Sequence, residues 1–344
     1  MDIKNLRILR HIQFIYKGII KRKTMYRKAS LAYDDCDEVI QAGFDKQEIL
    51  NDMMRMYMRY GYSFSEYLGF QFYKRAKSDR ITFIADWEHF GYADEMNNYA
   101  NRQIFDNKYQ TYQKFKPFFH REMILCKTKS DSQEYNDFRL RHSKCVVKPI
   151  KAAMGEGFQI LEHGKHSFNE LLENYHDGFI LEEYIVQDSR LAKFHAQSVN
   201  TIRIPTIRFD DEIVLLHPRL RIGQHGSHID NAGGGGILCD IDLNTGKIIS
   251  AADKKGNRYE THPDTKERII GFQIPLWEEA KRFARELSGV VSDNHYTAWD
   301  IALSENEWIM VEGNRRGQFG WQFSLQKGAR EEMDNYLARL GKRY

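Results

Sequence analysis

The chain has 344 residues, of which 42% are hydrophobic and 29% are charged, and its formal net charge is +3. This composition is typical of a soluble globular protein with a large core and two or three subdomains. No apolar run approaches the roughly 18 residues of a membrane span and no secretion-signal pattern is seen, so we expect neither a membrane-spanning nor a secreted protein.

The first helical pattern covers residues 3–20, where isoleucine and leucine recur at three- and four-residue steps. Residues 1–28 contain nine Lys or Arg and one Asp, so this end of the chain is strongly basic. We expect the apolar stripe to pack on the protein body. The alternative is peripheral contact of residues 1–28 with the anionic inner face of a membrane. No recognition pattern for nucleic acid accompanies the basic segment, so we expect no such partner.

Residues 34–115 are predicted to be mostly helical. Asp45 is placed to cap a helix, with a glutamate three positions on and a methionine-rich run that we expect in the core. A further helix is expected over residues 107–116, ending at Pro117 because proline has no N–H to donate. We assign residues 1–100 to a mainly helical N-terminal region.

The four cysteines stand far apart and form no C-x-x-C pair. This spacing argues against a structural zinc site and, without a secretion signal, predicts a reduced chain in the cytoplasm.

A predicted strand at 145–149 carries Lys148 near its end, and a small-residue loop at 154–157 leads into a second strand at 158–161. Such a hairpin can fold its tip over phosphates, with backbone N–H groups as donors. The alternative is a plain turn, because the loop is not a Walker sequence.

The apolar strand predicted at 179–186 is interrupted by Glu182 and Glu183. Buried carboxylates need partners, and a strand that leaves its sheet as a hinge offers an edge for a purine. By alternation, one of the two acids is expected to point to solvent.

Residues 198–209 and 212–222 are predicted as paired strands that carry Arg203, Arg219 and Arg221 at odd positions. Alternation can place the last two on one face, where guanidinium groups form a site for a carboxylate or phosphate. A solvated face explains single arginines equally well.

Four consecutive glycines follow at 233–236, and they suit backbone that moves or approaches a ligand closely. The nearby His225 and His228 have no partner at zinc-like spacing, so no zinc site is expected there. An amphipathic helix is predicted at 276–288.

Two apolar runs, 298–303 and 308–311, flank a polar tetrapeptide and predict a hairpin. Asp300 lies in its first strand, while Glu312 and Asn314 end the second, two residues apart and therefore on one side. Pairing can bring these three oxygen ligands together to bind Mg2+ that bridges phosphates. The alternative is an edge hairpin with a solvated turn.

Taken in order, these elements resemble the ATP-grasp superfamily: a lysine before a helix, a strand lysine with a glycine loop, an acidic hinge, arginine strands and an Asp…Glu-x-Asn hairpin. The spacing within that hairpin resembles D-alanine–D-alanine ligase and glutathione synthetase. Four stretches look closer to one branch, the sugar-transfer-associated ATP-grasp proteins found among bacterial polysaccharide biosynthesis genes: Ser198–Arg203, His217–Arg219, Asp230–Gly234 and Gly271–Pro275.

The resemblance implies an α+β fold in which two α+β subdomains clasp ATP between antiparallel sheets. The ATP-grasp domain would cover residues 101–344. It would comprise a lid subdomain at about 118–185, a metal-binding and catalytic subdomain at about 186–330, and a C-terminal helix at 329–341.

Carried over residue by residue, the resemblance also implies roles at the site. Lys108 and Lys148 would contact ATP phosphates, and Asp188 would bind ribose, although the ligases commonly have Glu there. Arginines would steady the transferred phosphoryl group or the substrate carboxylate. The remaining assignments are Met154, Gly155 and Gly157 in a loop over the phosphates, Glu182, Glu183, Tyr184 and Ile185 at the adenine, Asp300, Glu312 and Asn314 at two Mg2+, and Arg203, Arg219, Arg221 and Asn314 in catalysis.

The resemblance therefore implies an ATP- and Mg2+-dependent carboxylate–amine ligase, with Mn2+ able to substitute. Its substrates would be a sugar acid or amino acid for cell-surface polysaccharide, joined through an acyl phosphate. One alternative is a kinase that phosphorylates a hydroxyl group in the same cradle. Another is an inactive nucleotide-binding scaffold of a membrane-associated complex. The sequence does not indicate an oligomeric state.

Overall fold

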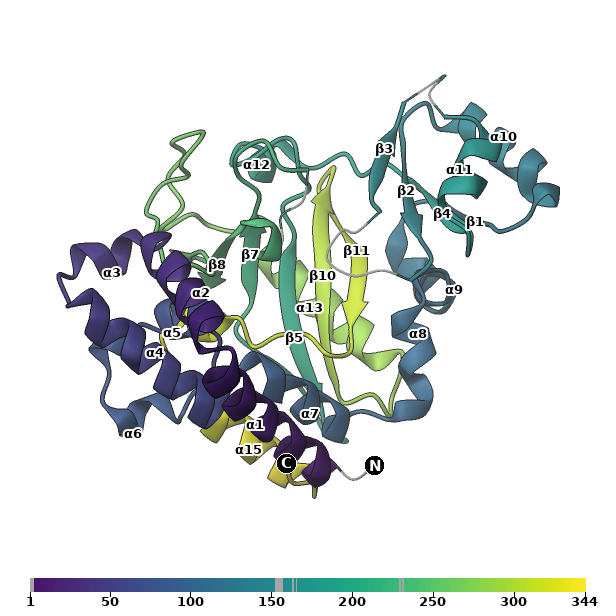
Figure 1. Cartoon of the computed structure of the whole chain (residues 1–344). Helices are drawn as coiled ribbons and strands as arrows, with labels where there is room; N and C mark the ends of the chain where they lie inside the picture. The colour runs from purple at the N-terminus through teal and green to yellow at the C-terminus, as the bar shows by residue number, and fades with distance from the viewer. Residues whose placement is uncertain (1–2, 152–156, 163, 165, 229, 231) are drawn as a thin grey trace.

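The computed structural model describes residues 3–151, 157–162, 164, 166–228, 230 and 232–344. Within these residues the strands form two antiparallel sheets: a small sheet in the order β1-β4-β2-β3, and a large seven-stranded sheet in the order β11-β10-β5-β7-β8-β9, with β6 paired to β5. A helical region lies at the N-terminal end (Figure 1). The mixture of helices and antiparallel sheets confirms the expected α+β class.

The helical region has one hydrophobic core of its own. Its methionine run is buried at Met53, Met54 and Met56, as predicted. The Asp45 side chain caps α4 by accepting a hydrogen bond from the backbone N–H of Glu48 at 2.8 Å. The elements are α1 (Ile3–Ile20), α2 (Arg22–Asp34), α3 (Asp37–Gln41), α4 (Lys46–Tyr60), α5 (Phe64–Gly69), η1 (Phe72–Lys74) and α6 (Lys77–Arg80).

Helix α1 does not bury its isoleucine stripe, and our expectation that the stripe packs on the body was wrong. Ile8, Ile12 and Ile19 are 60%, 56% and 61% exposed. The helix instead packs through Phe14, whose ring lies 5.3 Å from that of Tyr57, and through Gly18. A Cβ on this glycine would lie 2.3 Å from Met58 Cγ, so the close approach of the helix requires glycine.

The next helices lead from the helical region to the sheets. They are α7 (Asp86–Met96), η2 (Tyr99–Asn101), α8 (Arg102–Asp106) and α9 (Lys108–Phe119). Helix α9 runs past Pro117, contrary to prediction, because it is kinked at Phe115, whose φ and ψ are −111° and 17°. The kink leaves the proline at the start of a new turn, where a missing N–H costs little.

The small sheet has α10 and α11 on one face, at the upper right of Figure 1. Strand β2 lies between β3 and β4, so the predicted hairpin of β2 and β3 is present. The elements are β1 (Met123–Cys126), η3 (Lys129–Asp131), α10 (Ser132–Arg141), β2 (Cys145–Pro149), β3 (Gln159–Leu161), α11 (Phe168–Asn174) and β4 (Phe179–Glu183).

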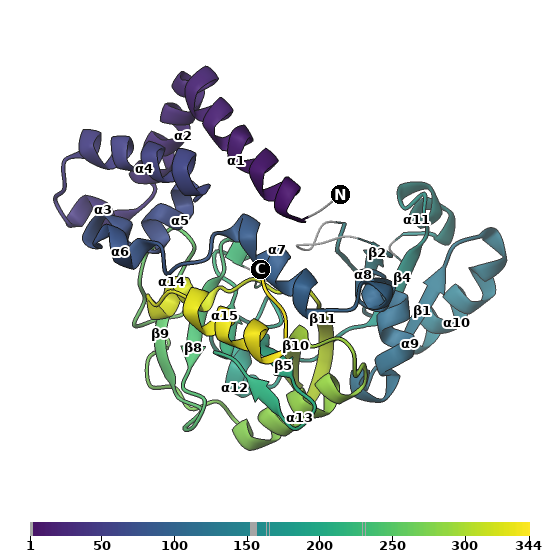
Figure 2. The ribbon, with the colours of Figure 1, turned by 90° about the horizontal axis from the view of Figure 1, so that it is seen from below.

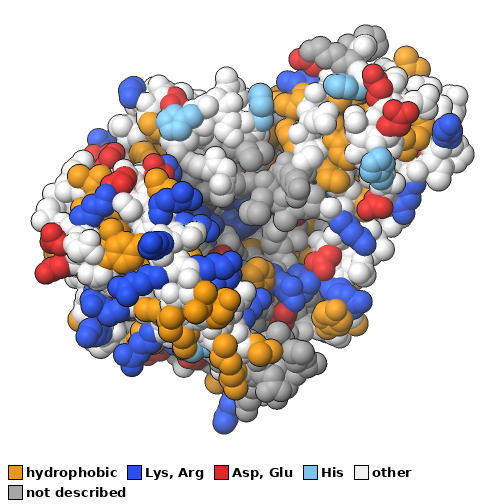
Figure 3. Space-filling model, viewed as in Figure 1, with side chains coloured by type: hydrophobic (Ala, Val, Ile, Leu, Met, Phe, Trp, Pro, Cys, Tyr) orange, Lys and Arg blue, Asp and Glu red, His pale blue; other side chains and the backbone are white. Residues whose placement is uncertain are grey.

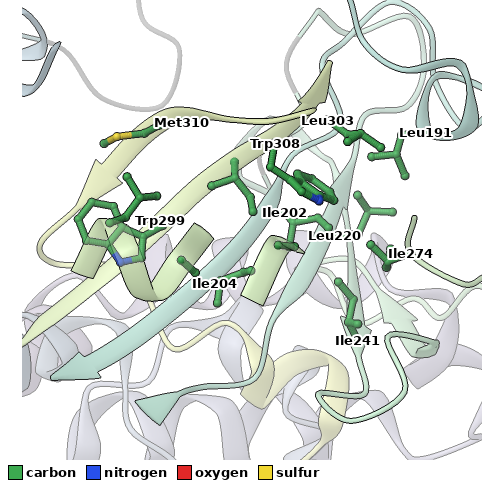
Figure 4. Close-up of a cluster of buried hydrophobic side chains, with 14 of the residues drawn as sticks. Leu191, Ile202, Ile204, Leu220, Ile241, Ile274, Trp299, Leu303, Trp308 and Met310 are labelled. Atoms are coloured by element: carbon green, nitrogen blue, oxygen red, sulfur yellow. The ribbon is translucent and has the colours of Figure 1, made fainter. Parts of the chain in front are cut away.

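The large sheet is apolar on one face and carries the arginines on the other. Ile202, Ile204, Leu220 and Trp299 point into a core shared with α13, as Figure 4 shows. The elements are α12 (Ser189–Ala192), β5 (Ile202–Arg208), β6 (Ile213–Leu215), β7 (Arg219–Ile222), η4 (Ala232–Gly234), β8 (Ile237–Ile241), β9 (Ile248–Ala252), α13 (Trp277–Gly289), β10 (Tyr296–Ser304), β11 (Glu307–Asn314), α14 (Trp321–Leu325) and α15 (Arg330–Arg339).

The return strand predicted at 212–222 is two strands, β6 and β7. Between them His217 has a φ of 27° and is followed by Pro218, which cannot donate to a sheet ladder. The hairpin of β10 and β11 has the predicted turn, with positive φ at Glu305 and Asn306 (48° and 76°). Two consecutive residues with positive φ are typical of the tight two-residue turns whose twist matches that of the paired strands.

Helix α7 lies beside α15, as Figures 1 and 2 both show. Tyr92 Oη donates a hydrogen bond to Asp334 Oδ1 at 2.7 Å, and the two helices share a core with Trp321. Helix α7 is therefore fixed against the large sheet, and this position brings its residues to the site described next.

Candidate active site

A row of charged side chains crosses five strands of the large sheet. The directly paired residues are Glu312, Asp300, Arg203, Arg219 and Asp240, on β11, β10, β5, β7 and β8 respectively. Directly paired residues of antiparallel strands point to the same face. The predicted metal ligands and arginines therefore share one face, opposite the apolar core.

Asp300 is the centre of this row. Arg203 donates to both of its oxygens, through Nε and Nη2 at 2.7 Å each, and Arg221 Nη2 lies 3.1 Å from Oδ2. Burial raises the pKa of Asp300, but Arg203 and Arg221 outweigh this effect and hold the pKa below its usual value. Asp300 is therefore an ionised carboxylate with two guanidinium partners.

The three predicted metal ligands lie around one cavity. Asn314 Nδ2 donates to Asp300 Oδ2 at 3.3 Å, and Glu312 lies directly across from Asp300. Among the described residues, no group of three or more His, Cys, Asp or Glu side chains is placed to hold a metal. A magnesium site here would thus need the amide oxygen of Asn314 beside the two carboxylates, a hard oxygen set that fits Mg2+. Asp300 would have to share its oxygens with the arginines.

Glu182 joins the two sheets. Its buried carboxylate accepts from Lys148 Nζ and from Arg121 Nε, each at 2.6 Å. Arg121 also donates from Nη1 to the carbonyl oxygen of Met310 on β11, at 2.5 Å. Burial raises the pKa of Glu182, but Arg121 and Lys148 overcome this and lower it to about 2. The carboxylate therefore holds the strand lysine in place.

The other hinge acid behaves differently. Glu183 Oε2 accepts from the backbone N–H of Glu122 at 3.0 Å, and Glu183 is less buried than Glu182. Tyr184 and Ile185 line the same cavity. Both hinge carboxylates have protein partners, so contact with adenine through these side chains would require them to be displaced. Whether this segment binds adenine stays a prediction.

Lys108 begins α9 and lines the cavity. Burial lowers the pKa of its ammonium group, with Glu312 opposing and Lys148 adding to this effect. The two predicted phosphate-binding lysines and the metal hairpin thus meet. Gly157 has a φ of 69°, a conformation that favours glycine. Met154 and Gly155 lie outside the described residues.

Asp188, the predicted ribose-binding residue, has other partners in the structure. It does not line the cavity, and its carboxylate caps α12 and accepts from Arg190 Nε and Nη2 at 2.8 Å each. The ribose assignment stays a prediction, and contact with a ribose would require the carboxylate to leave Arg190 and its N-cap position.

The cavity has a volume of about 780 Å³ and lies between the two sheets. Figure 3 shows Lys and Arg side chains around the hollow between the small sheet and the rest of the molecule. Part of its wall comes from elements that sequence reasoning did not connect with the site. These lining residues include His89, Phe90, Asp106, Lys254, Arg316 and Gln318.

Arg121, which holds Glu182, and Gln318, which lines the cavity, show why functional residues were missed. Arg121 lies in the stretch 118–142, whose mixed composition gives no clear periodicity. The need of a buried Glu182 for a cation was a usable signal, but it did not indicate which cation. Gln318 follows the metal hairpin within a few residues, and only the course of the chain back across the sheet brings it to the cavity.

No helix in the described residues is long and apolar enough to cross a membrane. No curated protein matches the sequence.

Comparison with solved structures finds ATP-grasp proteins. The ATP-grasp ligase PsnB, complexed with precursor peptide PsnA2 and AMPPNP, is 12% identical with a TM-score of 0.44, covering 72% of this chain and 63% of that one. The D-alanine–D-alanine ligase from Helicobacter pylori is 14% identical with a TM-score of 0.47, covering 74% and 69%. The N5-carboxyaminoimidazole synthetase from Staphylococcus aureus, complexed with ADP, is 11% identical with a TM-score of 0.42, covering 65% and 48%. The chain thus spans less than two thirds of the length of PsnB.

The profile of the sugar-transfer-associated ATP-grasp family matches residues 89–337, which begin in α7 and end in α15. This match extends over more than half of the chain and includes both sheets. The chain belongs to the sugar-transfer-associated ATP-grasp family and has the α+β fold of the ATP-grasp superfamily.

Proposed function

We propose that this protein is an ATP- and Mg2+-dependent ligase that joins a carboxylate to an amine through an acyl phosphate. The observation that carries this proposal is the cavity itself. It gathers Lys108 and Lys148, the oxygen ligands Asp300, Glu312 and Asn314, and the arginines of β5 and β7, which are Arg203, Arg219 and Arg221. Cations and metal ligands in one cavity are what phosphoryl transfer needs, because catalysis there is mostly positioning and charge stabilisation.

In the first step a carboxylate oxygen of the substrate attacks the γ-phosphorus, and the bond to the β,γ-bridging oxygen of ATP breaks to release ADP. Both reactants are anionic, so positive charge must offset their repulsion. Lys108 and Lys148 would hold the phosphates, and Arg203 and Arg221 would face the transferred group. Mg2+ held by Asp300, Glu312 and Asn314 would supply further positive charge at the phosphoryl oxygens.

In the second step an amine nitrogen attacks the carbonyl carbon of the acyl phosphate. The C–O bond to phosphate breaks, and the nitrogen loses a proton to form the amide. Because water competes for acyl phosphates, the site must exclude it. We propose the loop 154–157 and the glycines 233–236 as the lid segments that would exclude water from the acyl phosphate. Part of the first lies outside the described residues.

The family description supports substrates connected with sugar transfer. We propose a sugar acid or amino acid as the carboxylate, used in the cytoplasm for cell-surface polysaccharide. A kinase that phosphorylates a hydroxyl group would need a free base near the acceptor. Asp230 lines the cavity, but Oδ2 accepts from Thr201 N–H at 2.9 Å and Oδ1 lies 3.2 Å from Arg221. The carboxylate is thus engaged, which favours the ligase.

Trapping with hydroxylamine tests the ligase reaction. The protein with ATP, Mg2+, hydroxylamine and a panel of uronic acids and amino acids should release ADP and form the hydroxamate of one carboxylate. The acyl phosphate forms first and hydroxylamine then serves as its amine. ADP formation that instead accompanies a stable phosphate ester on a hydroxyl group would replace the ligase by the kinase. Nucleotide binding that is unchanged by Mg2+ and by Asn314→Ala would support a scaffold.

A further inference from the structure

The three arginines that the large sheet presents to the cavity differ in their partners. Arg203 and Arg221 both form ion pairs with Asp300. Arg219 is 2% exposed, and among the described residues it forms no ion pair. Its two hydrogen bonds, to the carbonyl oxygens of His217 and Gln318, are long at 3.4 Å each, and its Nε has no hydrogen-bond partner among the described residues. A buried cation without a counter-ion is costly, so the site is suited to an anion that comes from outside the chain.

Asp240 is the acid closest along the row, and its charge stabilises Arg219 without a direct ion pair between the two among the described residues. It is paired directly with Arg219 across β7 and β8, yet its Oδ2 accepts from Ser250 at 2.6 Å and its Oδ1 has no partner among the described residues. Burial lowers the pKa of Arg219 to about 10 and raises that of Asp240 to about 6. The attraction between the two side chains therefore does not fully offset the cost of burying their charges.

A second cation lies on the same wall. Lys254 lines the cavity and donates from Nζ to Gln318 Oε1 at 3.2 Å, and it too forms no ion pair among the described residues. Gln318 therefore connects both cations, since Arg219 donates to its backbone carbonyl and Lys254 to its side chain. Gln318 Nε2 donates in turn to Asp86 Oδ1 at 2.7 Å, which holds the amide in this orientation.

His89 adds an acceptor to this wall. It is 2% exposed, lines the cavity, and its Nδ1 lies at hydrogen-bond distance from the carbonyl oxygen of Asp86. A carbonyl cannot donate, so Nδ1 carries the proton, and burial lowers the pKa of the ring, which favours its neutral form. Nε2 is then an acceptor, and it has no partner among the described residues. It suits a hydroxyl group of a substrate.

We propose that Arg219 and Lys254 bind an anionic group of the acceptor substrate, a carboxylate or phosphoryl group, away from the reacting carboxylate. Arg219 lies two strands from Asp300, roughly 10 Å at ordinary strand spacing. That separation leaves room for a small hydroxylated acid between the metal hairpin and the anion. The inference rests on the proposed ligase function for the identity of this acceptor, but the anion site itself does not depend on turnover.

Anion binding can be measured on protein saturated with AMPPNP and Mg2+, so that the nucleotide site is filled. Inorganic phosphate and D-glucuronate are titrated by calorimetry as phosphoryl and carboxylate probes. We expect at least one to bind, and both Arg219→Gln and Lys254→Gln to weaken its binding by about 10- to 100-fold, the effect of losing a charge-assisted hydrogen bond. Affinity for AMPPNP should stay unchanged in Lys254→Gln.

Lys255→Gln is the matched control, because Lys255 is adjacent in sequence but exposed and paired with Asp35 at 2.6 Å. It should bind the probe as the unaltered protein does. The proposal is overturned if neither probe binds, or if Arg219→Gln and Lys254→Gln bind as tightly as the control. Should Arg219→Gln fail to fold, Lys254→Gln decides alone, since Lys254 is only half-buried. If the unaltered protein does not bind AMPPNP, this result would contradict the proposed function and not the anion site.

A separate observation concerns α1, whose apolar stripe is exposed. The stripe comprises Ile8, Leu9, Ile12, Ile15, Tyr16, Ile19 and Ile20, and Figure 3 shows it as a hydrophobic strip bordered by Lys and Arg. Residues 3–33 contain no Asp or Glu, while exposed cations continue into α2 at Arg22, Lys23, Arg27 and Lys28. A second copy of this face would set cations against cations. An anionic lipid surface satisfies both the apolar stripe and its basic border.

We infer that this face of α1 docks on an anionic lipid bilayer. In sedimentation with vesicles, the protein should bind phosphatidylcholine mixed with phosphatidylglycerol and should bind pure phosphatidylcholine weakly. Ile12→Asp should lower binding by at least about 10-fold, since burying an isoleucine contributes about 1.5–3 kcal/mol. Leu140→Asp, at a position 80% exposed on α10, is the matched control and should bind normally.

Three results would contradict this inference. The unaltered protein could fail to sediment with anionic vesicles, or Ile12→Asp could bind them as well as Leu140→Asp does. Alternatively, light scattering could show a dimer that Ile12→Asp abolishes, in which case a second copy covers the stripe. Because Ile12 is 56% exposed, an aspartate there leaves the core intact.

Discussion

Replacing Glu312 by Gln should lower ATP turnover with the best carboxylate by at least about 100-fold, the cost of removing one preorganised electrostatic group. Glu312 lies directly across from Asp300 and lines the cavity with Asn314. Glutamine keeps the size of the side chain and removes its charge. A bound metal ion would therefore lose a carboxylate ligand while the packing of the side chain is kept. Initial rates of ADP release at saturating ATP and Mg2+ measure the effect.

Glu305→Gln is the control for this experiment, because Glu305 lies in the exposed turn of the same hairpin. It should retain the original rate. Raising Mg2+ should partly restore the Glu312→Gln variant if the lost group is a metal ligand. Equal rates for the two variants would place metal binding and catalysis elsewhere in the cavity.

Replacing Arg121 by Met should destabilise the protein by about 3–5 kcal/mol at neutral pH, because it leaves a buried carboxylate without its main cation. Arg121 and Glu182 are both 3% exposed at their side chains. The same substitution removes the hydrogen bond to Met310, which connects the start of the small sheet to β11. Urea unfolding followed by circular dichroism measures the change.

The pH dependence of this loss has a definite sign. Arg121 and Lys148 lower the pKa of Glu182 to about 2 from 4.5. A carboxylate with a depressed pKa stabilises the folded state above its unfolded pKa, and this contribution is lost as pH falls. The difference between the unaltered protein and Arg121→Met should therefore be largest above pH 4.5 and shrink as pH falls from there toward 2.

Arg141→Met is the matched control, since Arg141 pairs with Glu122 at 2.5 Å with half of its side chain exposed. Solvent screens such pairs, so its effect on stability should be far smaller. Equal destabilisation by the two substitutions would show that Arg121 acts through its packing rather than through the charge of Glu182.

The ion pairs of Asp300 bear on how a nucleotide would enter. Arg203 and Arg221 occupy the carboxylate that a metal ion would also use. Both arginines would then turn from Asp300 toward the phosphates as the metal arrives. Arg219 is not engaged in this way, and in our proposal it would bind the acceptor rather than the reacting phosphoryl group.

Local sequence was sufficient wherever the relevant contacts are local. The spacing of Asp300, Glu312 and Asn314 predicted their convergence on one hairpin with a tight turn at Glu305 and Asn306. The register set by this turn extends only to the Ile301–Met310 pair, and a β-bulge beyond it brings Glu312 directly opposite Asp300. Alternation likewise predicted the shared face of the arginines. The methionine core of α4 followed from helical periodicity.

Other features depended on tertiary packing. Periodicity identified an apolar stripe on α1, but the helix packs through the opposite face because Gly18 allows a closer approach there. Asp188 has the right residue type near the hinge, yet it is used to cap α12.

The amino-acid sequence by itself determined the class of fold, the order of its elements and the charged groups that each strand presents. Only the tertiary structure decided which of those groups have partners. His89, Lys254 and Gln318 reach the cavity from elements far apart in the chain, and Arg121 reaches Glu182 from 61 positions away. No local pattern encodes such distances. The pairing of Asp300 with two arginines, which leaves Arg219 without an ion pair among the described residues, depends on how three strands align in the sheet.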